Sequence, residues 1–367
     1  MKRQVSLDIF RGLTLAAMLL VNNPGSWGHV YAPFLHAKWH GLTPTDLIFP
    51  FFLFIVGAAM YYSMAAFAVN SASAQTRNIP WLKIIKRTAL LFLIGFLLNI
   101  FPFNGVISEW RIMGVLQRIA LCYGVAAVLV CVFNIRQLVL CSIALLLAYW
   151  ALLNLVDVPY GLSTNLVRLV DLQVLGASHL YQGFGLAFDP EGLLSCLPAV
   201  VTVLAGYLTS AFLGQTKTAK SQYRSLLLYG IIALVVAGLW HVMFPINKAL
   251  WTSSYVLVTS GFAWLVLAAI IYLYDIKKHH SWFNWAQVYG SNPLFIYVIA
   301  WIFAVCLHLV SWKDSAGKAQ TLHRFIYGYL TSFMPEKLAS LCFALVFVLV
   351  FYGVSNFLYK RKIFIKL

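Results

Sequence analysis

Two histidines and an aspartate lie close together in the sequence, just before a long apolar stretch. The segment FLHAKWHGLTPTDLIFPFFLF, residues 34–54, places His36 and His40 ahead of Asp46. An imidazole beside a carboxylate is a serviceable general base, because the carboxylate holds the tautomer and stabilises the imidazolium as it forms. The segment therefore predicts proton-transfer chemistry at His36, with His40 as the weaker candidate.

Asn22 joins the same candidate site through topology rather than spacing. It closes the first predicted membrane helix, His36 lies in the loop that follows, and Asp46 begins the next helix. All three are expected at one membrane depth, where the Asn22 amide would donate to a developing oxyanion. A structural alternative stays open, in which Asp46 and Thr45 only cap their helix and Trp39 is an interfacial anchor.

The elements that would position these residues are membrane helices. Of the 367 residues, 62% are hydrophobic and 10% are charged, against about 45–50% and about 25% in soluble domains. A bilayer core about 30 Å thick is crossed by about 20 apolar residues. We therefore predict one all-α, polytopic domain over residues 1–367 with about ten transmembrane helices. The predicted spans are residues 6–24, 45–68, 85–104, 113–134, 137–155, 191–214, 223–245, 252–274, 290–311 and 336–359.

The net charge of +16 would suit a nucleic-acid binder, but its placement follows the membrane. Counted with the N-terminus inside, most Lys and Arg residues flank the predicted helices on that same side, as the positive-inside rule describes. We therefore predict that both termini are cytoplasmic and that the protein has no nucleic-acid partner. The cations of this predicted cytoplasmic side are Lys2, Arg3, Arg77, Lys83, Lys86, Arg87, Arg136, Lys217, Lys220, Arg224, Lys277, Lys278, Lys360, Arg361, Lys362 and Lys366.

The N-terminus is similar to a secretory signal, because basic residues precede an apolar run. Asp8 and Arg11 interrupt that run and no small-residue cleavage site follows it, so we expect a retained first helix.

The six cysteines lie in apolar segments without a CxxC pair, which predicts neither disulfides nor a metal site. Near the C-terminus, TLHRFIYGYLTSF predicts either a short amphipathic helix on the membrane interface or an ordinary loop.

Ionisable residues inside predicted spans are candidate functional groups, because charge is costly in hydrocarbon. Asp8 and Arg11 lie three apart on one helix face, either as a structural clasp or as part of a ligand site. Arg118 lies about 9 Å into the fourth span. Its long side chain therefore has an alternative role, in which it snorkels to the outer surface. Gln117 beside it faces another way.

Five blocks of the sequence follow one another in order over residues 6 to about 302. They are SLDIFRGLTLAAMLLVNNPGSWGHVYAPFLHAKWHGLTPTDLIFPFFLFIVGAAM, RIMGVLQRIALCY, GASHLYQGFGLAFDPEGLLS, NKALWTSSYVLVTSGFAW and GSNPLFIYVIAWI. Together these blocks resemble the heparan-α-glucosaminide N-acetyltransferase family of transmembrane acetyltransferases. The resemblance implies transfer of acetyl from cytoplasmic acetyl-CoA, across a bacterial inner membrane, to the amine of glucosamine or a glucosamine-terminated sugar on the periplasmic side.

The resemblance also implies roles for single residues. The family's active-site histidine matches His36 in LHAKWHGLTPTDL, and its asparagine matches Asn22 in the VN pair. His36 either takes the proton of the amine or accepts the acetyl group itself, and the sequence leaves both routes open. Lys248 and Trp251 have interfacial anchoring as an alternative role. The candidate acetyl-CoA residues are Arg11, Gln117, Arg118, Lys248, Trp251 and Asn292.

Two other functions stay open. A carrier that moves an amino sugar without chemistry would use the same intramembrane charges, although no repeat symmetry is visible. An O-acetyltransferase acting on an envelope glycan would keep the base and change the acceptor. Animal members of the family carry a luminal domain and an additional first helix, whereas this sequence begins at the core, so we expect a small amino sugar or short glycan as acceptor. We also consider a homodimer.

Overall fold

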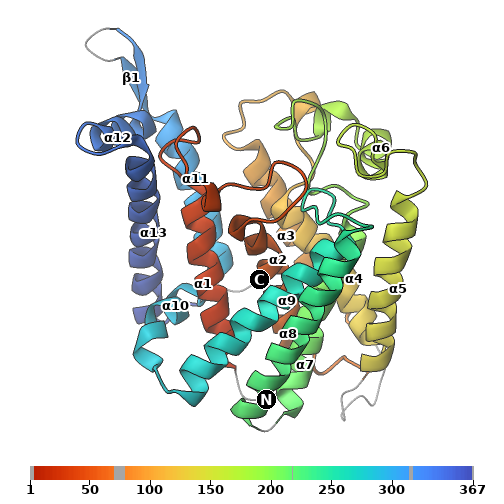
Figure 1. Ribbon diagram of the computed structural model, residues 1–367. Coiled ribbons are helices and arrows are strands. Elements are labelled where there is room, and N and C mark those ends of the chain that lie inside the picture. The colour runs from red at the N-terminus through yellow and green to blue at the C-terminus, as the bar shows by residue number, and fades with distance from the viewer. Residues whose placement is uncertain (1–3, 70–78, 217, 314–316, 366–367) are drawn as a thin grey trace.

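A bundle of long helices forms the body of the protein in the computed structural model, which describes residues 4–69, 79–216, 218–313 and 317–365. The short helices α6 and α12 and a hairpin lie at one end of the bundle, and the N-terminus lies at the other (Figure 1). Helices are present at each of the predicted spans. Of the predicted cytoplasmic cations, Lys2, Arg3, Arg77, Lys217 and Lys366 lie outside the described residues.

The long helices follow one another with few other elements between them. They are α1 Val5–Asn22, α2 Ile48–Ser63, α3 Trp81–Ile100, α4 Val115–Val132, α5 Ile135–Leu153, α7 Cys196–Gln215, α8 Ala219–His241, α9 Ser253–Ile270, α11 Pro293–Leu309 and α13 Glu336–Lys360. The short elements are α6 Leu166–Val174, α10 Asn284–Tyr289, α12 Leu322–Thr331 and the antiparallel strands β1 Ser311–Lys313 and β2 Ala319–Thr321. The segment predicted as an interfacial helix or a loop is thus a helix, α12, with no buried residue.

The number of membrane spans is slightly lower than the sequence predicts. Among the described residues, eight helices are long and apolar enough to cross a membrane, and the pair α10 and α11, bent by 64°, makes a ninth if counted as one span. α3 is the exception, because Lys83, Lys86 and Arg87 lie in its first two turns. The all-α polytopic architecture is confirmed, while the side on which each terminus lies stays a prediction.

Close contact between α2 and α7 fixes the start of α2, where the candidate site lies. A Cβ on Gly57 would overlap the carbonyl of Val203, and one on Gly206 would overlap the carbonyl of Phe54. The two backbones therefore touch without side chains between them, as is common for small residues between membrane helices. Because α2 begins directly after Asp46, this packing also sets the depth of that carboxylate.

Candidate active site

Asp46 is held by its own turn. Pro44–Leu47 form a single 3-10 turn that runs into α2. The backbone N–H and the hydroxyl of Thr43 both donate to Asp46 Oδ2 at 3.0 Å, and the N–H of Ala37 donates to the same oxygen at 3.1 Å. The expected capping role of Asp46 is therefore present, but the expectation for Thr45 is wrong, because the Thr45 hydroxyl donates to the Pro33 carbonyl instead.

The second oxygen of Asp46 is left for His36. His36 Nδ1 lies 2.7 Å from Asp46 Oδ1, with side-chain exposures of 47% for the histidine and 1% for the aspartate. An Nδ1–H donated to a buried carboxylate leaves Nε2 as the ring's free acceptor. The Tyr255 hydroxyl on α9 donates to the Asp46 carbonyl at 2.6 Å, which ties the turn to a third helix. The arrangement is that of an oriented general base.

Lys248 reaches this histidine from the loop between α8 and α9. Its Nζ lies 3.0 Å from His36 Nδ1, 3.2 Å from His36 Nε2 and 3.6 Å from Asp46 Oδ1. Burial lowers the pKa of Lys248, while the charges of Asp46 and Glu191 oppose that shift. The structure therefore places the Lys248 amine at the candidate base, in a side chain that is only 21% exposed.

The Lys248 loop is fixed by its neighbours. The Asn247 side chain accepts from the Leu250 N–H at 2.8 Å, and the Gly41 N–H donates to the Ile246 carbonyl at 2.8 Å, which joins the loop to the His36 segment. His40, the weaker candidate base, lies 3.4 Å from Asn247 Nδ2 through its Nδ1. Burial lowers the pKa of His40, and His241 adds to that effect. His40 is thus part of the support of this loop.

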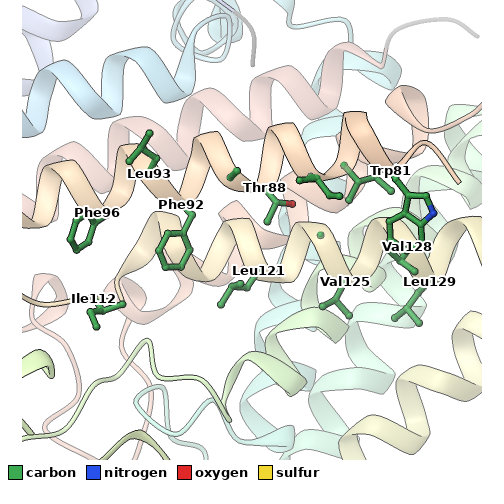
Figure 2. Close-up of a pocket in the computed structure, with 14 residues that line it drawn as sticks. Trp81, Thr88, Phe92, Leu93, Phe96, Ile112, Leu121, Val125, Val128 and Leu129 are labelled. Atoms are coloured by element: carbon green, nitrogen blue, oxygen red, sulfur yellow. The ribbon is translucent and has the colours of Figure 1, made fainter. Parts of the chain in front are cut away.

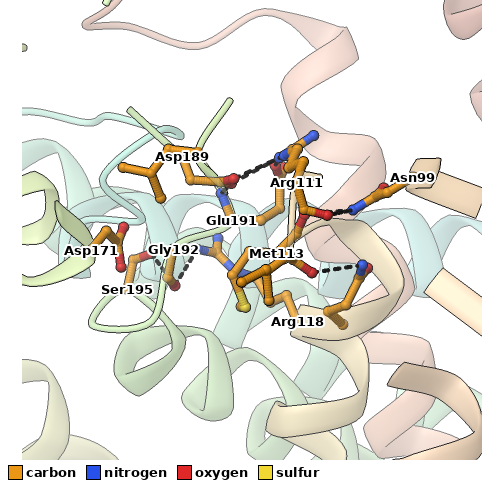
Figure 3. Close-up of polar contacts among 12 residues, drawn as sticks. Asn99, Arg111, Met113, Arg118, Asp171, Asp189, Glu191, Gly192 and Ser195 are labelled. Carbon is orange, nitrogen blue, oxygen red and sulfur yellow. Dashed lines mark hydrogen bonds and ion pairs between the residues drawn. The ribbon is translucent and has the colours of Figure 1, made fainter. Parts of the chain in front are cut away.

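A second polar cluster contains Arg111, Arg118, Asp189 and Glu191 (Figure 3), and the charges of Glu191 and Arg118 act on Lys248. Arg111 donates twice to Asp189 at 2.8 Å and once to Glu191 at 2.6 Å. Burial alone would lower the pKa of Arg111, but the hydrogen bonds and charges of both carboxylates raise it. These three residues were not predicted as part of a site from the sequence, although two of the resembling segments, RIMGVLQR and FDPEG, carry them with opposite charge.

Arg118 is completely buried, which excludes the alternative in which it snorkels to the outer surface. Its Nη2 donates to the Gly192 carbonyl at 3.2 Å and to the Ser195 hydroxyl, and its guanidinium lies 4.9 Å from the ring centre of Trp251. Within the described part of the chain, its Nε and Nη1 have no hydrogen-bond partner. Buried guanidinium N–H groups without a partner are costly, which makes Arg118 a candidate for binding a ligand.

Trp251 is also buried, at 1% exposure, so it is not an interfacial anchor. Its indole N–H donates to the Thr202 hydroxyl at 3.3 Å, and its ring packs edge-on against Phe49. Its backbone φ of 51° is unusual for a bulky residue. Trp251 therefore forms part of the wall behind Arg118.

Two of the predicted acetyl-CoA residues meet elsewhere, at the bend between α10 and α11. Arg11 contacts Asp8 Oδ1 at 3.0 Å and the Gly290 carbonyl at 3.3 Å, which confirms the clasp on α1. Asn292 donates to the Ile363 carbonyl at 2.9 Å and accepts from the Ile365 N–H at 2.7 Å. α10 lies toward the end of the bundle opposite α6 and α12 (Figure 1).

The two remaining predicted residues also face other parts of the fold. Gln117 is fully buried and donates to the Ile112 carbonyl at 3.0 Å, at the contact between α3 and α4. Asn22 is exposed at the end of α1 and lines a cavity of about 210 Å³ together with His308 and His323. The predicted oxyanion role of Asn22 therefore has no geometric support in this structure, and it stays a prediction.

A larger hollow, of about 820 Å³, lies between α3 and α4. Its lining is almost wholly apolar, with Trp81, Phe92, Leu121 and Val125 around the single hydroxyl of Thr88 (Figure 2). It offers no base and no charged group for acetyl transfer. The chemistry-bearing residues therefore gather around His36 and not in this groove.

Known proteins match the chain over most of its length. Residues 3–244 match a family model described as "Heparan-alpha-glucosaminide N-acetyltransferase, catalytic". The chain is 31% identical to the heparan-alpha-glucosaminide N-acetyltransferase of Mus musculus over 352 residues, which are 80% of this chain and 52% of the relative. Identity to the Homo sapiens protein is 30% over 353 residues, with the same shares. The chain thus spans about half the length of the curated relatives it matches.

Proposed function

The chain belongs to the heparan-α-glucosaminide N-acetyltransferase family, and from that premise we propose that it moves acetyl from acetyl-CoA to the amine of glucosamine or of a glucosamine-terminated sugar. The observation that carries the proposal is the His36–Asp46 pair, with Asp46 buried and His36 half exposed. A buried carboxylate and an accessible imidazole are what proton abstraction from an incoming amine requires.

The proposed mechanism begins with that proton. As the amine nitrogen attacks the thioester carbonyl, His36 Nε2 takes its proton, and Asp46 stabilises the resulting imidazolium through Nδ1. CoA leaves as a thiolate, and His36 then passes the proton from the amine to the CoA sulfur. In the alternative route, Nε2 attacks the thioester first, and the acetyl-imidazole then passes its acetyl group to the amine. Both routes need the same free Nε2.

In this proposal acetyl-CoA is the co-substrate, and the polar groups around Arg118 would bind part of it. Arg118 has two buried N–H groups without a partner among the described residues, and carbonyl oxygens of a thioester or of the pantetheine arm would satisfy them. We therefore keep Arg118 as an acetyl-CoA residue, with Trp251 as the ring that packs against its guanidinium. Arg11, Gln117 and Asn292 stay weaker proposals, because their polar groups contact the fold itself.

For location, we propose a bacterial inner membrane with the acceptor on the periplasmic side and acetyl-CoA supplied from the cytoplasm. The support is the asymmetric placement of Lys and Arg along the sequence. Sealed vesicles of known orientation test this arrangement. Acetyl transfer supported only by acetyl-CoA added on the His36 side would contradict it. The homodimer also stays a prediction, for which light scattering of the purified protein is the direct test.

Labelled acetyl-CoA and glucosamine, incubated with the purified protein in detergent, test the activity. We expect labelled N-acetylglucosamine from the wild type and at least about 100-fold less from His36→Ala. Product from both proteins would remove His36 from the centre of the reaction. No acetyl-CoA consumption with any acceptor would favour the amino-sugar carrier, and a product cleaved by mild base would favour the O-acetyltransferase.

A further inference from the structure

Lys248 places a primary amine where the acceptor amine has to be. A general base acts on a group within hydrogen-bond distance, roughly 2.6–3.2 Å. Lys248 Nζ lies 3.2 Å from His36 Nε2, the ring nitrogen that Asp46 leaves free. The functional group at the base is therefore the same as the one that the proposed reaction acetylates.

The surroundings keep this amine in place and favour its reactive form. The loop that carries Lys248 is bonded to the His36 segment, and its side chain is mostly shielded from solvent. Burial and the nearby Arg118 lower the pKa of Lys248, against the charges of Asp46 and Glu191. An amine attacks a carbonyl carbon only in its unprotonated form, so these conditions increase the fraction able to react.

We propose that Lys248 is an acetylation site of the protein itself, modified by its own active site when no acceptor sugar is bound. The inference rests on the proposed function, because it needs acetyl-CoA at His36. An N–C bond forms between Lys248 Nζ and the acetyl carbonyl carbon, and the C–S bond of the thioester breaks. The proton lost from Nζ passes to His36 Nε2 and then to the departing thiolate, so the products are N-acetyl-Lys248 and CoA.

The modified side chain would block the site that made it. Acetylation removes the positive charge of Lys248 and puts an acetamido group next to His36 Nε2, where an incoming amine needs room. The acetamido group also matches the one on an N-acetylated sugar, so acetyl-Lys248 imitates a bound product. The acceptor sugar is expected to protect Lys248, and enzyme kept with acetyl-CoA alone is expected to lose activity.

Lys38 is the matched control, because it lies two residues from His36 in the same outer loop and is exposed. The experiment incubates purified protein with acetyl-CoA carrying a ¹³C-labelled acetyl group, with and without glucosamine, and measures label on each lysine peptide by mass spectrometry. We expect Lys248 to gain label about 100-fold faster than Lys38. Excess glucosamine is expected to suppress the label at Lys248 alone.

Two variants separate an enzymatic event from simple chemical acetylation. His36→Gln keeps a polar side chain of similar size, and is expected to slow labelling of Lys248 to the rate of Lys38. Lys248→Arg removes the primary amine, and whatever the starting rate of this variant is, that rate is expected to stay constant during incubation with acetyl-CoA alone. Label at Lys248 that is equal in the wild type and in His36→Gln would overturn the inference.

The outcomes also distinguish this inference from the proposed function. Formation of N-acetylglucosamine with no more label on Lys248 than on Lys38 would overturn the inference and leave the function intact. His36-dependent label on Lys248 without N-acetylglucosamine would support the inference and exclude glucosamine as the acceptor. If neither forms, both are overturned.

Discussion

Two buried polar regions of this protein use similar residues in different ways. At the bend between α10 and α11, Arg11 and Asn292 direct their polar groups to backbone atoms and to Asp8. At the candidate site, by contrast, the Lys248 amine lies against the ring nitrogen of His36 that is not bonded to Asp46, and two N–H groups of Arg118 have no partner among the described residues. Polar groups that face one another or stay unsatisfied, rather than polar groups bonded to the backbone, thus mark the candidate site.

The largest expected effect is at Asp46. Asp46→Asn keeps the shape of the side chain but removes the charge that stabilises the imidazolium, and we expect kcat to fall by about 1,000-fold or more, as in other carboxylate–histidine pairs. The pH profile of acetyl transfer in detergent is the measurement. Asp157→Asn, in an exposed part of the loop between α5 and α6, is the control. A loss of less than about tenfold would mean that the pair only supports the loop.

The next effect distinguishes the two arginines. Arg118→Lys removes the guanidinium N–H groups that the fold leaves unpartnered, and we expect KM for acetyl-CoA to rise by about 10- to 100-fold. Arg11→Lys, at the bend, is expected to change KM by less than about threefold. Initial rates against acetyl-CoA concentration measure both. The reverse pattern would place the acetyl-CoA site at the bend and leave Arg118 as a structural residue.

At the bend itself, stability is expected to change rather than catalysis. Asn292→Ala leaves the Ile365 N–H and the Ile363 carbonyl without their partner, at a cost of about 1–3 kcal/mol in the free energy of unfolding. Thermal unfolding in detergent should show the loss, while kcat measured well below the transition stays within about twofold of the wild type. A large loss of kcat with unchanged stability would assign Asn292 to the active site.

The smallest effect concerns Asp171, which lies in the cluster around Arg118 (Figure 3). Burial raises the pKa of Asp171 to about 7, with Asp189 adding to the rise and the Leu193 N–H and Arg118 opposing it. The folded protein therefore keeps a proton that the unfolded chain loses near its ordinary value, so this contribution to stability is present at low pH and falls as the pH rises through about 7.

Asp171→Asn tests this directly, because it fixes a neutral side chain. We expect Tm to rise by about 2–4 °C at pH 8 and by less at pH 5, where the folded protein still keeps the proton that the unfolded chain has already lost. Unfolding curves of both proteins at the two pH values give the comparison. Equal differences at the two pH values would show that Asp171 is not a neutral acid in the folded protein.

The sequence predicted the fold class and two pairings between residues that are close in the chain, Asp8–Arg11 and His36–Asp46. His36 and Asp46 meet because a loop returns directly to the start of a helix. The role of Lys248 depends on a loop more than two hundred residues away, which no local pattern brings to His36. The sequence left snorkelling open for Arg118 for a similar reason, because the segment at Gly192 and Ser195 that covers it is distant in the chain.

The number of membrane-spanning helices differs between sequence and structure because of α3. α3 carries three cations in its first two turns, yet it packs along α4 like the neighbouring spans. α3 therefore differs from the other long helices in its charged residues, but not in how it packs in the bundle. The Arg111–Asp189–Glu191 cluster was within reach of the sequence, since opposite charges next to membrane helices favour pairing.

The glycine contact between α2 and α7 also bears on how the acetyl group would reach the base in the proposed reaction. α2 is in backbone contact with α7, and the turn before it is bonded to α9 through Tyr255. These contacts hold Asp46 at one place in the bundle. In the mechanism that we propose, the flexible pantetheine arm of acetyl-CoA therefore carries the acetyl group to His36.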